Sequence, residues 1–234
     1  MSHCFIITSA INTKFGVFDG RKRLEQTLET IQSIRARVSD VVIVIIEMSA
    51  IPLSIHQKSV LSENCNFLIE YSGSDFVKEI FKSDNWDVVK NLTEVACFRD
   101  SLKILRENNI FFAVERIYKI SGRYKLNNNF NINTHNSSKE IILSKSRQSQ
   151  FNVNLTGVHR QYMSRLWSWP SSSLDLITEA FNSGFEYMLN RIENGGYCDI
   201  EHMLYAKLNQ FNPKELDLIG VEGFLGPNGI LVND

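Results

Sequence analysis

The sequence predicts an α/β protein with a mostly parallel sheet flanked by helices, followed by a C-terminal extension of helices and short strands. The first observation behind this prediction is the succession of a strand, a helix and a strand over residues 3–47. The second is the run VVIVIIE at residues 41–47, which is typical of a strand buried on both faces of a parallel sheet. The third is that apolar runs and helical periods continue to alternate through the strand that contains Tyr118.

The elements of the first half follow from these patterns. Residues 3–9 are an apolar run with strand character, and residues 11–20 are expected to form a loop. A helix is predicted over residues 21–38 because Leu24, Leu28 and Ile31 recur at helical spacing, with polar side chains on the other face. After the strand at 41–47, we expect helices at 54–61, 75–82 and 92–107, and strands at 66–71 and through Tyr118.

The second half is less regular. Residues 127–150 are rich in Asn and Ser, which predicts a mobile loop around one short strand at residues 140–144. Residues 162–169 alternate like a strand that stops at Pro170. Amphipathic helices are expected at 174–191 and 200–208, and GPNG at residues 226–229 predicts a turn between two short strands. No domain boundary is apparent, so we predict a single domain over residues 1–234.

The composition limits the classes of function. Hydrophobic residues make up 43% and charged residues 22% of the chain, which is ordinary for a folded, soluble protein. The net charge of −1 gives no overall attraction to nucleic acid or to an anionic membrane, so any anion site has to be local. No apolar run reaches the roughly 20 residues that span a bilayer, and the N-terminal run is too short for a signal peptide. We therefore expect a cytoplasmic protein with no nucleic-acid partner and no membrane span.

The most informative local pattern is IYKISGRYKL at residues 117–126. A strand-like alternation there meets Gly122, which lies between the cations Lys119 and Arg123. A glycine that interrupts a strand marks a bend or a close backbone approach, and the cations supply the positive charge of a phosphate or carboxylate site. The alternative is an edge strand with two solvated cations.

Polar residues follow the first two predicted strands, at the sheet edge where ligands of open α/β sheets bind. Thr8 and Ser9 end the first strand. Glu47 closes the second, so it is placed to accept hydrogen bonds from a ribose or a base edge, or is simply a polar residue that leaves the core. Arg23 lies among cations at the start of a helix, where the macrodipole is already positive; either solvation or a bound anion would relieve this conflict. We take Arg23 as a candidate phosphate contact.

Several common catalytic motifs are missing from the sequence. It has no GxxxxGK[ST] or GxGxxG loop, which argues against a P-loop kinase and a dinucleotide oxidoreductase. It also has no HExxH, no GxSxG and no Asp-x-Asp. The nearest acidic pair is Asp199 and Glu201, at the start of a predicted helix. Capping is the preferred interpretation of Asp199, whereas Glu201 and His202 remain candidate acid/base residues.

Several short stretches of the chain resemble small GT-A-type glycosyltransferase-like proteins of bacteria and their viruses, which act on nucleotide-diphospho-sugars. The resemblance rests on short stretches: TSA at 8–10, RLEQTLETI at 23–31, IIE at 45–47, KISGRY at 119–124 and GVEGF at 220–224. It implies a Rossmann-type, GT-A-like fold with a nucleotide-binding half over residues 1–126 and an acceptor-side half over residues 127–234. A nucleotide-sugar would bind at the carboxyl ends of the sheet, usually with a divalent metal held by Asp-x-Asp. The loop at 127–150 could close over this donor as a lid.

The sequence departs from the family pattern where the acidic motif is expected, because Ser121, Gly122 and Arg123 stand there. Fixed cations can neutralise a leaving diphosphate as a metal does, which predicts a metal-independent arrangement, although a divalent metal stays possible. No other cofactor is expected. The predicted donor site has Thr8, Ser9 and Glu47 around the nucleoside, and Arg23, Lys119, Gly122 and Arg123 around the diphosphate.

The predicted activity is transfer of a sugar from a nucleotide-sugar to a glycan or related acceptor. Arg165 and Trp167 are candidate acceptor contacts because the indole can stack on a sugar face, with core packing as the alternative for Trp167. Glu201 and Glu222 are the candidate catalytic bases. The alternative function is an inactive module of the same fold that binds nucleotide-sugar. A nucleotidyltransferase is disfavoured because Gly16 and Gly20 alone do not make a glycine-rich N-terminal loop.

Overall fold

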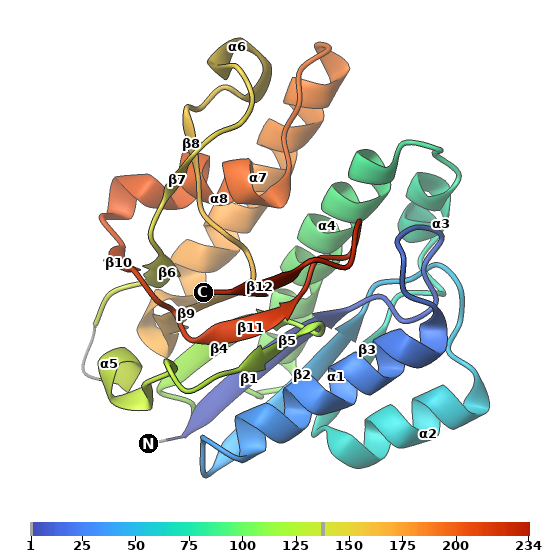
Figure 1. Ribbon diagram of the computed structural model, residues 1–234, viewed down its shortest axis with the longest axis vertical. Coiled ribbons are helices and arrows are strands. Elements are labelled where there is room, and N and C mark those ends of the chain that lie inside the picture. The colour runs from blue at the N-terminus through green and yellow to red at the C-terminus, as the bar shows by residue number, and fades with distance from the viewer. Residues whose placement is uncertain (1, 137–138) are drawn as a thin grey trace.

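The computed structural model describes residues 2–136 and 139–234 and shows a central seven-stranded sheet with helices on both faces (Figure 1). The strand order is β10-β6-β9-β4-β1-β2-β3. Within this sheet β9 is antiparallel to β4 and β6, and the remaining neighbours are parallel. The predicted α/β class with a mostly parallel sheet is therefore confirmed. The strands are β1 (His3–Ser9), β2 (Val41–Glu47), β3 (Phe67–Glu70), β4 (Arg116–Ser121), β6 (Ile142–Ser144), β9 (Leu166–Pro170) and β10 (Lys214–Leu216).

Two hydrophobic layers hold the helices to the sheet. Side chains of a strand point alternately to its two faces, so Phe5 and Ile7 of β1 lie on one face and Cys4 and Ile6 on the other. The first face is covered by α1 (Gly20–Arg35) and α2 (Ile55–Asn64). The second is covered by α4 (Trp86–Glu107), α7 (Leu174–Glu193) and α8 (Ile200–Leu208), with the short α3 (Asp75–Phe81) packed beside α4.

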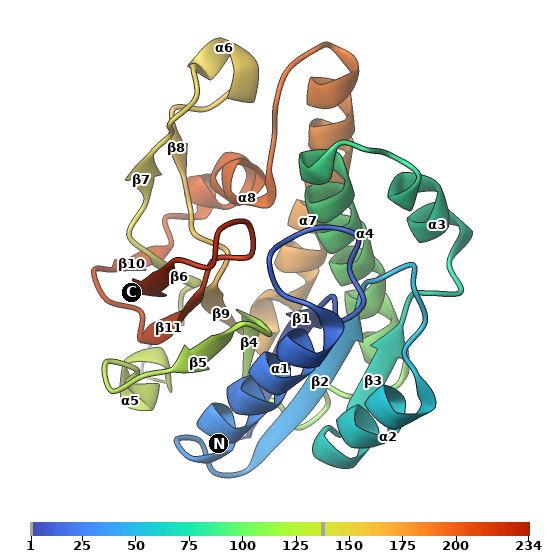
Figure 2. The same cartoon turned by 45° about the vertical axis from the view of Figure 1, so that its right-hand side comes forward.

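Smaller elements surround this frame. A three-stranded antiparallel sheet joins β5 (Tyr124–Leu126) to the hairpin of β11 (Val221–Phe224) and β12 (Leu231–Asn233), which confirms the predicted turn at residues 226–229. The two strands β7 (Arg147–Gln148) and β8 (Arg160–Gln161) form an arm that carries α6 (Val153–Thr156) at one extremity of the molecule (Figure 2). The remaining pieces are α5 (Ile132–Asn136) and 3₁₀ turns at Ser171–Ser173 and Asn209–Phe211.

Three predicted elements need correction. The helix expected from residue 92 begins at Trp86, because the Asn85 side chain caps it by accepting hydrogen bonds from the amides of Asp87 and Val88. The strand expected over residues 162–169 begins only at Leu166. The short strand expected at residues 140–144 is present as β6, but the rest of residues 127–150 is not one loop, since it contains α5 and β7. β6 is also an interior strand of the central sheet. This placement argues against a lid over the whole segment, of which residues 137–138 lie outside the described residues.

None of the helices in the described part of the chain has the length and apolar character needed to cross a membrane.

Candidate functional site

A cavity of about 210 Å³ lies at the carboxyl ends of β1, β2 and β4. The strand β1 has β2 on one side and β4 on the other, so the winding of the chain reverses between β1 and β4. Ligands of open α/β sheets bind at such switch points, as the sequence predicts for this protein. Thr8 and Ser9 of β1 and Ser121 of β4 contribute to the wall, together with α4, Glu201 of α8 and the turn at residues 225–227.

Lys119 does not line the cavity and is almost completely buried. Its ammonium donates hydrogen bonds to Oε1 of Glu94 at 2.7 Å, to Oγ of Ser121 at 2.9 Å and to the carbonyl oxygen of Ser164 at 2.8 Å. These bonds use all three of its N–H donors. The structure therefore argues against Lys119 as a diphosphate ligand and shows it holding Glu94 in the cavity wall.

Glu94 is a carboxylate of the cavity wall. Its Oε1 also accepts a hydrogen bond from the hydroxyl of Thr8, at 3.2 Å, which ties α4 to the end of β1. Burial alone would raise the pKa of Glu94, but the charges of Lys119, Lys90 and Arg123 outweigh it and lower the pKa below its ordinary value. Glu94 is therefore ionised at neutral pH.

Arg23 shapes the loop between β1 and α1 and also lines the cavity. Its guanidinium donates to the carbonyl oxygens of Phe18, Ala10 and Phe15 at 3.1, 3.1 and 3.2 Å. Burial and the neighbouring charge of Arg123 lower the pKa of Arg23 to about 10, against a smaller opposite effect of Glu47. Because three of its five N–H donors are used, two remain for a ligand.

Arg123 makes no hydrogen bond or ion pair with any residue in the described ranges, although its Nε is buried. Its side chain lines the cavity, and Gly226 packs directly on its guanidinium: a Cβ added there would lie 3.4 Å from Cζ of Arg123. Arg123 is close enough to Arg23 for the two charges to oppose each other. Two neighbouring guanidiniums, one of them unpaired, create a local positive potential that suits an anion.

Gly122 allows a close approach, but the partner is the protein itself. A Cβ at Gly122 would lie 3.0 Å from Oγ1 of Thr27 in α1 and 3.3 Å from Cγ2 of Ile7. The Gly122 amide donates to the carbonyl oxygen of Thr8 at 2.9 Å. Gly122 thus lets α1 pack on the ends of β1 and β4, and it does not line the cavity, so the structure argues against it as a diphosphate contact.

Glu47 is completely buried and joins two loops. Its Oε1 accepts hydrogen bonds from the amide of Ile11 at 2.9 Å and from that of Ser49 at 3.4 Å. Burial raises the pKa of Glu47 to about 7, although hydrogen bonds from Ser9, Ile11 and Ser49 favour the ionised form. Glu47 is absent from the cavity wall, so its predicted contact with the nucleoside is not supported.

The raised pKa of Glu47 predicts a pH dependence of folding. Because its pKa is about 7 in the folded chain and ordinarily 4.5, the native protein binds the extra proton between these values. This group therefore favours folding below pH 4.5, and its contribution is lost as the pH rises to about 7. The free energy of unfolding, measured with urea, should fall more between pH 5 and pH 8 for the wild type than for Glu47→Gln. Equal losses in the two proteins would contradict the raised pKa.

Of the remaining predicted site residues, some line the cavity and some lie elsewhere in the fold. Trp167 is completely buried, with its ring 4.5 Å from that of Trp169, so core packing is the correct interpretation. Glu222 lies on the small sheet, pairs with Lys125 at 3.5 Å and does not line the cavity. Arg165 lines the cavity and is ion-paired with Asp234. The cavity thus brings together Thr8, Ser9, Arg23, Arg123, Arg165 and Glu201, but not Glu47, Lys119, Gly122, Trp167 or Glu222.

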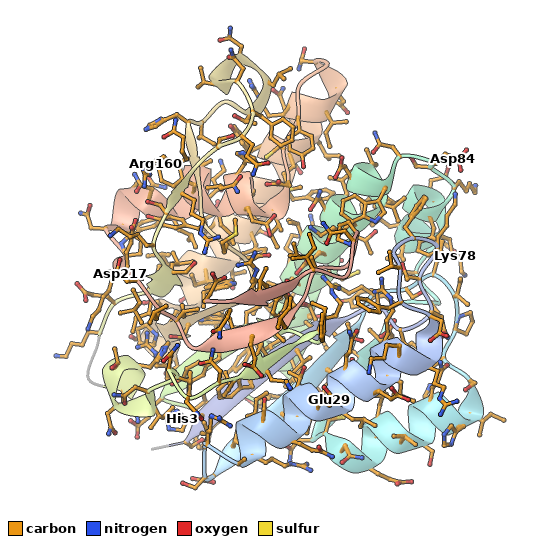
Figure 3. All side chains as sticks on the ribbon, in the orientation of Figure 1. His3, Glu29, Lys78, Asp84, Arg160 and Asp217 are labelled. Atoms are coloured by element: carbon orange, nitrogen blue, oxygen red, sulfur yellow. The ribbon has the colours of Figure 1, made fainter. Side chains whose placement is uncertain are left out.

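The start of α8 places two of the acidic candidates differently. Asp199 caps the helix as predicted, since its Oδ1 accepts from the amide of His202 at 2.8 Å and contacts His202 Nδ1 at 2.6 Å. His202 is completely buried, and its Nε2 lies 2.8 Å from Oγ of Ser149. Glu201 instead faces the cavity and accepts a hydrogen bond from Oγ of Ser164 at 2.6 Å. Arg160 lies in the arm, outside the cavity (Figure 3). Its guanidinium donates to Oγ of Ser146 at 3.0 Å and to the carbonyl oxygen of Ser146 at 2.6 Å.

Sequence reasoning missed the wall that α4 contributes. This wall and the turn at residues 225–227 add Trp86, Val89, Lys90, Thr93, Glu94, Leu225, Gly226 and Pro227 to the cavity. The helical spacing of Trp86, Val89 and Lys90 was the available signal, but it falls before the start that we predicted for the helix.

The residues of this cavity do not fit a divalent metal. Arg123 and Ser121 occupy the place expected for the acidic motif, and Oε1 of Glu94 is already engaged by Lys119 and Thr8. Across residues 2–136 and 139–234, no three His, Cys, Asp or Glu side chains gather in a way that could hold a metal ion.

No protein-family model matches this sequence, and no curated protein matches it either. The chemistry of the cavity is therefore the basis for proposing a function.

Proposed function

We propose that the cavity binds a nucleotide-sugar through its diphosphate and that the protein transfers the sugar to a glycan or related acceptor. The observation that carries this proposal is the unpaired guanidinium of Arg123 in the wall of a switch-point cavity. Planar guanidinium groups engage phosphate oxygens with two parallel hydrogen bonds, so a diphosphate matches Arg123 in both charge and geometry. The GT-A-like resemblance and the place of the cavity on the sheet support the same ligand.

Arg123 and Arg23 would stabilise the diphosphate as it leaves. Negative charge develops on the bridging oxygen while the bond from the anomeric carbon to the diphosphate breaks. Cations fixed in place before the reaction stabilise this charge without reorganising, which is the role of a metal ion in many related reactions. Thr8 and Ser9, at the end of β1, would contact the nucleoside side of the donor.

Glu201 would act as the base. It is a cavity carboxylate that the Ser164 hydroxyl holds in position. As the acceptor oxygen forms its bond to the anomeric carbon, the hydroxyl proton of the acceptor passes to Glu201, and the nucleoside diphosphate departs with the electron pair of the broken bond. Arg165 would lie on the acceptor side of the same cavity.

Nucleotide binding is the first test. A ligand that binds only the native state stabilises it by about 2.7 kcal/mol at a hundredfold excess over its dissociation constant. Thermal-shift measurements with UDP, GDP, CMP and dTDP and their sugars should therefore identify at least one clear stabiliser. An unchanged melting temperature with every compound at millimolar concentration would contradict the proposal.

Turnover distinguishes the transferase from a non-catalytic module of the same fold. The stabilising nucleotide-sugar should be hydrolysed slowly without acceptor, because water can replace the acceptor hydroxyl. Glu201→Gln should bind the donor and lose this hydrolysis. Tight binding by the wild type, with no turnover for any acceptor, would instead favour the binding module.

A further inference from the structure

One face of α4 forms a wall of the cavity that combines polar and apolar side chains. Trp86, Val89, Lys90, Thr93 and Glu94 follow the spacing i, i+3, i+4, i+7 and i+8, which places them on one side of a helix. The wall therefore offers an aromatic ring, an ammonium group, a hydroxyl and a carboxylate within the cavity that contains Arg23 and Arg123. These are groups that bind a polyhydroxylated ring.

Thr93 gives this wall an unmet hydrogen-bonding requirement. The residue is 5% exposed, it lines the cavity, and its buried Oγ1 has no hydrogen-bond partner. A threonine within a helix ordinarily bonds to the carbonyl four residues earlier, as Thr27 does with Arg23. Buried hydroxyls without a partner are rare and costly, so the Thr93 hydroxyl is suited to a polar group of a ligand.

Lys90 lines the cavity with N–H donors free of any described partner, and nearby carboxylates offset its positive charge. It makes no hydrogen bond or ion pair with any described residue, and its Nζ lies 5.4 Å from the centre of the Trp86 ring. Burial alone would lower the pKa of Lys90, but the carboxylates of Glu201, Glu94 and Asp199 outweigh burial and raise it. Three carboxylates thus lie near enough to stabilise the charge of this ammonium without bonding to it, and its N–H donors remain available.

We infer that the α4 wall binds the sugar of the donor and selects a neutral, hydroxylated sugar over one that carries a carboxylate, an inference that rests on the proposed function. A neutral sugar can accept hydrogen bonds from Lys90, bond to the Thr93 hydroxyl and donate to Glu94. Its apolar face can stack on the Trp86 ring. A sugar carboxylate would instead compete with Glu94 and Glu201 for Lys90 and would be repelled by both.

Calorimetric titration separates this inference from the proposed function. The probes are UDP, UDP-glucose and UDP-glucuronate, or GDP, GDP-mannose and GDP-mannuronate if guanosine nucleotides stabilise the protein. The neutral nucleotide-sugar should bind more tightly than the free diphosphate, and at least about tenfold more tightly than the uronate, a difference of about 1.4 kcal/mol. A uronate that binds as well as the neutral sugar overturns the inference. Failure of every nucleotide of the thermal-shift panel to bind, UDP and GDP included, overturns the proposed function as well.

Variants of the wall test the assigned residues. Thr93→Val should leave the affinity for the free diphosphate unchanged and reduce the additional affinity for the neutral sugar about two- to tenfold, as expected for one neutral hydrogen bond. Its melting temperature should not fall, because the lost hydroxyl has no partner in the protein. Lys90→Gln should likewise reduce the ratio of the affinity for the neutral nucleotide-sugar to the affinity for the free diphosphate. Lys103→Gln, at an exposed position on the same helix, should leave this ratio unchanged. An unchanged ratio in both wall variants would overturn the assignment.

Discussion

Replacing Arg123 by alanine is expected to weaken nucleotide binding by about 1.5–3 kcal/mol, the range for a hydrogen bond to a charged group. The melting temperature without ligand should change little, because Arg123 has no hydrogen bond or ion pair to lose among the described residues. Arg123→Lys should retain part of the affinity, since lysine keeps the charge and loses the planar fork. Calorimetric titration with the stabilising nucleotide measures both effects.

The matched control for this variant is Arg21→Ala. Arg21 is an exposed arginine near the start of α1, with 88% of its side chain accessible, and it is outside the cavity. Its loss should leave nucleotide affinity unchanged. Wild-type affinity in a well-folded Arg123→Ala protein would contradict the assignment and would move the diphosphate site to Arg23 or Arg165.

Replacing Lys119 by methionine is expected to destabilise the fold by about 3–5 kcal/mol, because it leaves the Glu94 carboxylate enclosed without its cation. The ammonium and the carboxylate are 2.7 Å apart, with 1% and 9% of their side chains exposed. Urea unfolding measures the loss. The double variant Lys119→Met with Glu94→Gln should recover a large part of it, since no uncompensated charge remains.

Lys103→Met is the control for this change, because an exposed lysine on α4 should alter stability by no more than about 0.5 kcal/mol. The opposite pattern, a stable Lys119→Met protein with selectively weaker nucleotide binding, would restore Lys119 as a diphosphate ligand.

The fold was predictable where a local pattern determines the element. The β-branched run of β2 and the helical period of α1 are properties of the sequence itself, and both elements occur within a few residues of the predicted bounds. The short strand predicted at residues 140–144 occurs as β6, but its place inside the sheet was not predictable, because it has only three residues within a polar segment and is held there by pairing with β9 and β10. Pairing partners far apart in the chain leave no periodic signal.

The site was predictable at strand ends and poorly predictable elsewhere. Thr8 and Arg123 follow from the rule that ligands bind at the carboxyl edge of the sheet. The sequence does not show that Lys119 meets Glu94 across 25 positions, so a buried ion pair resembled an anion site. The alternating pattern around Trp167 likewise fits either a core or a surface position. Only the packing of Trp167 against Trp169 and Phe98 shows that it is a core residue.

A crystal structure grown with the stabilising nucleoside diphosphate tests the central claim most directly. We expect the diphosphate in the cavity at the carboxyl ends of β1 and β4, with its oxygens within hydrogen-bonding distance of the Arg123 guanidinium and next to Arg23. A diphosphate bound elsewhere on the molecule, with Arg123 still unpaired, would contradict the claim.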